Sequence, residues 1–159
     1  MRLSPKGIKL LHDREGCVLT AYKDTVGVWT IGYGMTFYPN KTRVKQGDKL
    51  TQKQADDMFA YVLENDFEKP IEKLLVGVNL NQDQYDALVS FAFNVGVSAL
   101  STSTLLRNLK AGKIKDANKQ FARWVFPVEI TSRRKAESRQ FAGIEFSDKA
   151  DLDPLVGWL

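Results

Sequence analysis

The chain has 159 residues, 43% hydrophobic and 26% charged, so it can bury a core and has the composition of an ordinary globular domain. Its net charge of +4 and sequence pI of about 9.1 favour polyanionic partners such as nucleic acid, anionic lipid or acidic cell-wall polymers. One cysteine excludes an internal disulfide, and one cysteine with one histidine excludes a structural zinc site. The sequence contains neither a run of about 20 apolar residues nor a recognisable signal peptide. We expect a single domain made in a cytoplasm, with no stable membrane insertion, no metal and no cofactor.

The N-terminal part of the chain combines one helix with short β-prone runs. Ser4 is a good N-cap residue and is followed by proline at the first helical position. Gly16 is a typical helix stop, so the carboxyl group of Glu15 is expected at the helix end. Residues 17–38 then alternate in short runs punctuated by glycines. They predict a small antiparallel sheet of two or three strands, the third over 35–38.

The rest of the chain has a helical period. Thr51 and Gln54 form a capping box before a helix over about 51–68, which Pro70 ends or kinks unless it starts the next helix. Asn81 and Gln84 precede a helix that is apolar almost all round, so we expect it at the centre of a larger lobe. The remaining predicted elements are a capping and turn region over 98–104, helices over 105–109 and 114–124, and a last helix over 131–143.

Three polar residues around the predicted sheet fit the chemistry of glycoside hydrolysis. That reaction needs one acid to protonate the leaving oxygen and a second carboxylate to direct water or attack the sugar. Glu15 and Asp24 lie on either side of the helix-to-hairpin junction, and Thr30 follows on a strand expected to pair beside Asp24. A threonine hydroxyl there could hold a water against the carboxylate. The alternative is that Asp24 only shapes a turn, because Asp side chains commonly bond turn amides.

The stretch YKDTVGVWTIGYG resembles the signature of phage-type lysozymes, the endolysins of glycoside hydrolase family 24. NLNQDQYDALVSFAFNVG with STLLRNLKAG is similar to the central helix of that family and the segment after it, and RWVF with RRKAESRQF to its arginine-rich helix. The resemblance therefore covers about residues 4–142. It implies an α+β, mainly α-helical lysozyme-like domain over 1–159. In this fold a small β-lobe (about 15–50) and a helical lobe (1–14 and 70–159) are joined by the helix over 51–68, with the cleft between them.

The resemblance also implies an activity. By position, Glu15 is the general acid, and Asp24 and Thr30 activate water. The bond cleaved is the β-1,4 link between N-acetylmuramic acid and N-acetylglucosamine in peptidoglycan. Inverting chemistry follows if the two carboxyl groups leave room for that water. The alternatives are a lytic transglycosylase, which cleaves the same bond with one acid, and a non-catalytic protein that binds cell wall or nucleic acid. No helix-turn-helix or aromatic RNA-binding motif supports nucleic acid as the partner.

Three further residues are candidate substrate contacts. A polar residue at the position of Asn94 lies in the family's cleft, where it contacts acetamido groups. Gly34 is expected to let the substrate approach the backbone closely, although a plain turn also accounts for a glycine there. Phe93 is included as a candidate, with core packing as the alternative interpretation.

Other features depart from the family pattern or stay outside it. Met35 stands where the family often has a histidine after the glycine pair, and PVEITS replaces a glycine-bearing turn. The tail over 144–159 has no ready counterpart and is expected to pack against the domain or to face the wall or membrane. The basic run that includes Arg133 and Arg134 predicts a solvated helix face, part of which must point to solvent or form ion pairs. His12 is expected at the surface.

The absence of a recognisable export signal bears on where such an enzyme would act. We expect a monomer that is synthesised in the host cytoplasm, is released by a holin-type protein and acts on peptidoglycan in the periplasm. Host cell lysis would be the result.

Overall fold

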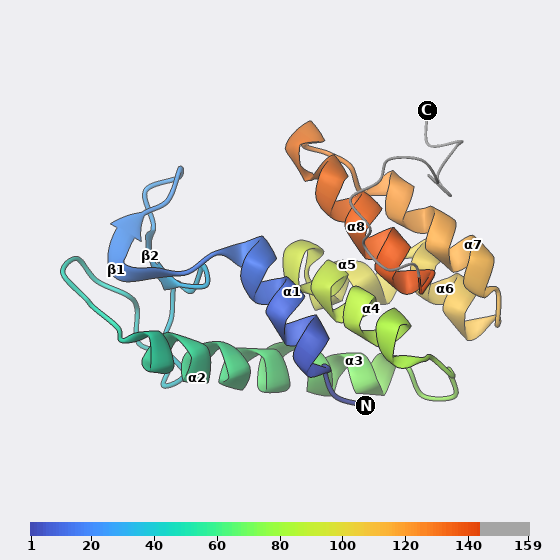
Figure 1. Cartoon of the computed structure of the whole chain (residues 1–159), viewed down its shortest axis with the longest axis horizontal. Helices are drawn as coiled ribbons and strands as arrows, with labels where there is room; N and C mark the ends of the chain where they lie inside the picture. The colour runs from blue at the N-terminus through green and yellow to red at the C-terminus, as the bar shows by residue number, and fades with distance from the viewer. Residues whose placement is uncertain (144–159) are drawn as a thin grey trace.

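The computed structural model describes residues 1–143, and the predictions made for the tail at 144–159 lie outside them. A small lobe carrying the two strands stands beside a larger lobe of packed helices, and a long helical run joins them along one side (Figure 1). Helix α1 lies between the strands and the helical lobe. The predicted α+β, mainly α-helical architecture with a small antiparallel sheet is confirmed.

Helix α1 (Pro5–Glu15) has the boundaries that its capping residues predict. Ser4 Oγ accepts a hydrogen bond of 2.9 Å from the amide of Gly7, and the Gly16 amide donates 2.9 Å to the His12 carbonyl oxygen. Gly16 adopts φ 68°, a conformation that favours glycine and turns the chain out of the helix. Asp86 accepts hydrogen bonds from both the amide and the hydroxyl of Ser4, which fixes the start of α1 to the helical lobe.

The sheet has two antiparallel strands, β1 (Val18–Lys23) and β2 (Trp29–Gly32), with Tyr22 paired to Thr30. Of the two or three strands predicted, two are observed, and residues 35–38 do not form a third. The glycines at positions 32 and 34, with φ of 61° and 81°, turn the chain so tightly that Met35 pairs back onto Ile31 in an isolated bridge. Met35 is buried in the apolar core.

The connecting helix predicted over about 51–68 continues directly into the next helix. The whole run comprises α2 (Gln52–Val62), a π-helical segment (Leu63–Glu68) and α3 (Lys69–Leu74), and it starts with the predicted Thr51–Gln54 capping box. Pro70 lies in the first turn of α3, so it starts that helix instead of ending the run. Proline has no amide hydrogen and clashes with the carbonyl four residues back. In the π-helical segment before Pro70, the backbone hydrogen bonds span five residues instead of the four of an α-helix.

The helical lobe is built around α4, which is capped by Asn81 and Gln84 as predicted. Residues 98–104 do not form a turn region. Gly96, with φ 93°, ends α4 and allows a new helix to start at once, and Ser103 then caps the following one. In chain order the helices are α4 (Gln82–Val95), α5 (Val97–Thr102), α6 (Thr104–Lys110), α7 (Ile114–Lys119) with a 3-10 turn at Gln120–Arg123, a second 3-10 turn at Val128–Ile130, and α8 (Thr131–Phe141).

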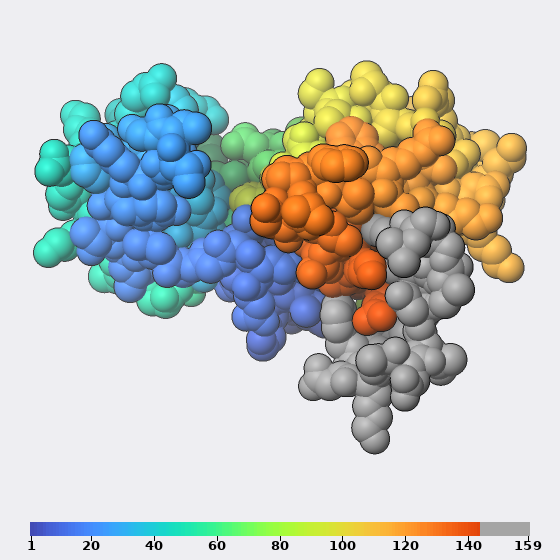
Figure 2. All heavy atoms as spheres, turned by 90° about the horizontal axis from the view of Figure 1, so that it is seen from above, coloured from blue at the N-terminus to red at the C-terminus, as the bar shows by residue number. Residues whose placement is uncertain are grey.

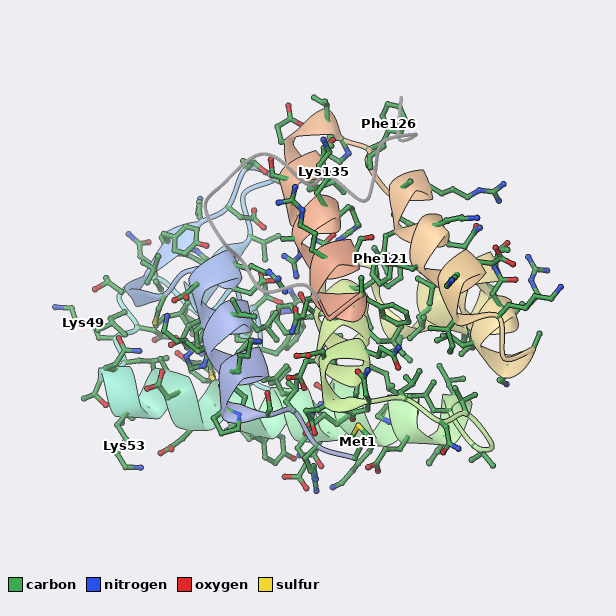
Figure 3. The ribbon with its side chains drawn as sticks, turned by 45° about the vertical axis from the view of Figure 1, so that its right-hand side comes forward. Met1, Lys49, Lys53, Phe121, Phe126 and Lys135 are labelled. Carbon is green, nitrogen blue, oxygen red and sulfur yellow. The ribbon has the colours of Figure 1, made fainter. Side chains whose placement is uncertain are left out.

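Aromatic side chains hold α4 against its neighbours. Phe91 of α4 packs edge-on against Phe121 at a ring separation of 5.3 Å, and Phe121 contacts Phe141 of α8 at 5.6 Å. Phe121 lies inside the lobe beside α8, whereas Phe126 stands out at the end of the lobe (Figure 3), where it is 85% exposed. Edge-to-face pairs of this kind add about 0.5–1.5 kcal/mol each to the area that they bury. These contacts fix the positions of α4 and α8 relative to each other.

Candidate active site

The surface is hollowed between the two lobes. Figure 2 shows this hollow, with the small lobe on one side, the yellow and orange helical lobe on the other, and green atoms of the chain between positions 60 and 90 at its bottom. The chain passes from the C-terminal end of α1 directly into β1 of the small lobe (Figure 1). A residue at that end of α1 therefore lies at the junction of the lobes.

Glu15 is the last residue of α1, and its side chain is 18% exposed. Arg133 of α8 approaches it with Nη1 2.6 Å from Oε1. Arg133 is itself held in place, because its Nε donates to Glu137 (2.9 Å) and its Nη2 donates to the carbonyl oxygen of Ser90 (2.9 Å). The carboxyl group of Glu15 thus faces, from the helical lobe, a guanidinium that is held by two hydrogen bonds of its own.

A buried ionic network lies behind Arg133. Arg134 and Glu137 are both completely buried and meet at 2.6 Å. Arg134 also donates from Nε to the carbonyl oxygen of Trp124 (2.9 Å) and from Nη2 to Asn94 Oδ1. Burial lowers the pKa of Arg134, while the charge of Glu137 opposes that shift. The prediction of a solvated basic face is wrong for this part of α8, and the alternative that its charges form pairs is the one observed.

Asp24 lies at the turn between the strands. Its Oδ1 accepts hydrogen bonds from the amides of Val26 (3.0 Å) and Val28 (2.8 Å), which is the turn-forming arrangement considered from the sequence. Within residues 1–143, Oδ2 has no protein donor. One oxygen of the carboxylate therefore fixes the side chain, and the other remains available to a water or a substrate group.

Thr30 lies close to Asp24. Its hydroxyl donates to the carbonyl oxygen of Val28 (3.0 Å), the residue whose amide donates to Asp24. The same carbonyl oxygen of Val28 also accepts a hydrogen bond of 2.9 Å from the Asp24 amide, so both residues are bonded to Val28. Because the hydroxyl proton is already used, Thr30 can act on a water only as a hydrogen-bond acceptor.

The three candidate substrate contacts are placed differently. Gly34 is exposed at the turn after β2, with φ 81° and open space where a side chain would be. Asn94 is exposed near the end of α4, and its bond to Arg134 uses only the oxygen, so the amide hydrogens are free to donate. Phe93 is half-buried and packs on Phe59 and Phe67 at ring separations of 5.3 and 4.8 Å, which is the core packing considered as its alternative role.

Sequence reasoning missed the residues that hold the acid. Glu137 was not singled out, and neither were Arg14 and Ser90. Arg14 donates to the Ser90 hydroxyl (2.8 Å), and that hydroxyl donates to Glu137 (2.8 Å). The spacing of Arg133 and Glu137 at i and i+4 on one helix was an available signal for an ion pair. A serine in the middle of the apolar α4 helix was another, since a buried hydroxyl requires partners.

Two further properties concern the described residues only. Across residues 1–143, no three side chains from His, Cys, Asp and Glu come close enough together to hold a metal ion. In the same part of the chain, no helix is both long and apolar enough to cross a membrane.

Comparison with known proteins places the chain in a family. A family model described as phage lysozyme matches residues 12–137. The endolysin of Acyrthosiphon pisum secondary endosymbiont phage 1 is 39% identical over 127 residues, covering 78% of this chain and 80% of that protein. The endolysin of Salmonella phage P22 is 37% identical over 145 residues, covering 89% and 98%. The crystal structure of a P22 lysozyme mutant superposes with a TM-score of 0.75 at 33% identity, covering 89% of this chain and 99% of that one. The chain belongs to the phage lysozyme family.

Proposed function

We propose that the chain is a phage endolysin that hydrolyses the β-1,4 bond between N-acetylmuramic acid and N-acetylglucosamine in peptidoglycan. Glu15 is the general acid that protonates the leaving oxygen. Asp24 acts as general base on the attacking water, and Thr30 orients that water. These assignments rest on the residue types and on where the described side chains lie.

The arrangement around Val28 supports this proposal most directly. The Asp24 carboxylate accepts from the Val28 amide, and the Thr30 hydroxyl donates to the Val28 carbonyl oxygen. A base and a hydroxyl that are anchored to the same residue are held at a constant separation. Each still has a lone pair for a water, which is what a residue pair that prepares a nucleophile requires.

The acid is arranged differently from the base. Glu15 belongs to the last turn of α1 and contacts Arg133, whereas Asp24 belongs to the hairpin and is bonded only to backbone amides. Two carboxyl groups in distinct environments suit distinct roles, one delivering a proton and the other accepting one. We further propose that the amide hydrogens of Asn94 and the open backbone at Gly34 bind the sugar.

Release and oligomeric state are also proposed. The enzyme acts as a monomer after it reaches the periplasm through a holin-type lesion. Expression in a Gram-negative host with and without an inducible holin tests this, since lysis should require the holin. Lysis without any holin would contradict the proposed route of release.

Digestion of purified peptidoglycan in water enriched in ¹⁸O tests the reaction itself. Hydrolysis adds water, so mass spectrometry should find muropeptides with a reducing N-acetylmuramic acid that carries one ¹⁸O atom. A lytic transglycosylase would instead leave 1,6-anhydro ends without label, and a non-catalytic wall-binding protein would give no soluble products. Either of these results would refute the proposal.

A further inference from the structure

Four polar side chains meet where α1, α2 and the turn after β2 come together. The hydroxyl of Tyr33, in that turn, donates to Asp56 Oδ1 at 2.6 Å and lies 3.3 Å from His12 Nδ1. Gln52 Nε2 donates to the Tyr33 hydroxyl oxygen (3.1 Å) and to Asp56 Oδ1 (2.8 Å). We refer to His12, Tyr33, Gln52 and Asp56 as the Tyr33 clasp. Its members come from three segments that are far apart in the sequence.

We infer the tautomer of His12 from a count of the hydrogens in the clasp. The single hydroxyl proton of Tyr33 is donated to Asp56, so the oxygen can only accept from its other neighbours. It accepts one hydrogen from Gln52, and the His12 ring must supply the other from Nδ1. The neutral histidine therefore carries its proton on Nδ1, and a second proton on Nε2 would leave this bond intact.

Stacked rings reinforce these bonds. The rings of His12 and Tyr33 are stacked, with centroids 4.4 Å apart and an angle of 20° between their planes. Both also contact Phe59 of α2, at 5.1 Å from His12 and 4.5 Å from Tyr33. The ring contacts hold the hydroxyl over its partners, and His12 is a half-buried junction residue instead of the surface residue expected from the sequence.

Electrostatics keep Tyr33 protonated and Asp56 ionised. Burial and the bond to Asp56 raise the pKa of Tyr33, so its hydroxyl stays protonated as a donor. The bonds from Tyr33 and Gln52 lower the pKa of Asp56, so it stays a charged acceptor. Cys17 is a further titratable group beside the clasp, with Sγ 3.7 Å from Gln52 Nε2.

We propose that Tyr33 is a positioning residue that sets the separation between the acid and the water-holding residues. His12 precedes Glu15 by about one turn of α1, and Tyr33 follows Thr30 directly after β2 ends. The contact between His12 and Tyr33 therefore links Glu15 to Thr30, since each contacting residue is three positions from its catalytic candidate. This inference rests on the proposed function of Glu15 and Thr30. A shift of about 1 Å in such an arrangement can cost about 100-fold in rate.

Tyr33→Phe tests the proposal, because it keeps the stacked ring and removes only the hydroxyl. Tyr38→Phe is the matched control, since the Tyr38 hydroxyl also donates to a carboxylate (Asp48, 2.8 Å) within the small lobe, and both of these residues lie outside α1 and α2. On a soluble peptidoglycan oligosaccharide, Tyr33→Phe should lower kcat about tenfold or more while KM changes less than about twofold. Tyr38→Phe should leave both constants close to those of the wild type.

The results separate this inference from the proposed function. A wild-type protein that does not hydrolyse the oligosaccharide would refute the function. An active wild type with equal kcat for the two phenylalanine variants would refute the role of Tyr33 and leave the function standing. A fall in thermal stability alone, with kcat unchanged, would reduce Tyr33 to a structural residue and likewise overturn the proposal.

His12 provides an independent test in the unmodified protein, since it is the single histidine of the chain. Nitrogen-15 NMR of its ring should show the Nδ1–H form near neutral pH or above, wherever the ring is neutral. In Tyr33→Phe this preference should shift toward the Nε2–H form. An Nε2–H form in the wild type would show that the hydrogen-bond count in the clasp is wrong.

Discussion

Glu137→Gln is the substitution that most strongly tests the buried network behind Glu15. The Glu137 carboxylate accepts from Ser90 (2.8 Å), Arg133 (2.9 Å) and Arg134 (2.6 Å), and it is completely buried. Glutamine has the same shape but replaces one oxygen by an NH₂ group. In either orientation that group faces a donor, so at least one guanidinium loses its acceptor, and the buried cations lose their counter-charge.

The expected cost follows from the burial. Removing one partner of a buried ion pair destabilises a protein by about 3–5 kcal/mol because it leaves the other charge uncompensated. A domain of this size loses about 2–4 °C in Tm per kcal/mol, so Tm should fall by about 6–20 °C. Calorimetry gives Tm, and urea denaturation gives the free energy of unfolding for the same variant.

Asp57→Asn is the matched control. Asp57 also pairs with a residue four positions away on its helix, Lys53, at 2.6 Å, but both side chains are largely exposed. Exposed pairs of this kind contribute little to stability because water screens them, so Tm should stay within about 2 °C of the wild type. If Glu137→Gln proved as mild as Asp57→Asn, the network would not be buried and paired as described, and the account of how Arg133 is held would fail.

Two further predictions concern stability. Gly7→Ala should lower the free energy of unfolding in urea by about 1–3 kcal/mol, because the added Cβ would lie 2.5 Å from Asp86 Cγ. Alanine normally stabilises a helix interior relative to glycine, so a gain in stability would contradict this packing. Asp56→Asn should be less stable than the wild type, by an amount that is constant above about pH 5 and shrinks as the pH falls below about 4. The reason is that the pKa of Asp56 is lowered in the folded protein, so the stability that its carboxylate contributes is lost when it is protonated. A difference in stability between variant and wild type that does not change between pH 3 and 7 would show that Tyr33 and Gln52 do not stabilise the carboxylate.

The parts of the fold that were predictable from the sequence are those that local chemistry decides. Ser4 and Gly16 define α1 through capping, so the position of Glu15 at the helix end could be read directly. The capping boxes at Thr51 and Asn81 likewise locate the starts of α2 and α4. The two strands were also predictable, since the glycine turn between them is a local signal.

The parts that could not be predicted depend on long-range packing. The partner of Glu15 is Arg133, whose guanidinium reaches it only because α8 packs on α4 beside the end of α1. A basic run reads from sequence as a solvated face, because nothing local shows that Arg134 meets Glu137 in the interior. The Tyr33 clasp is similar, since His12 and Asp56 share no sequence neighbourhood.

The same distinction applies to the candidate site. Asp24 and Thr30 are both bonded to Val28 within one short hairpin, whose register the turn determines. The turn-forming role of Asp24 and its proposed catalytic role are compatible, because each uses a different oxygen. For Phe93 the structure favours packing, since its ring contacts two other aromatic rings.

The central claim is that Glu15 donates the proton on which cleavage depends, and Glu15→Gln tests it most directly. The variant keeps the shape of the side chain and removes its acidic proton. We expect hydrolysis of purified peptidoglycan to fall by about 10²–10⁴-fold, as is typical when a general acid is lost, with an unchanged circular dichroism spectrum. A folded Glu15→Gln variant that solubilises peptidoglycan at close to the wild-type rate would contradict the account.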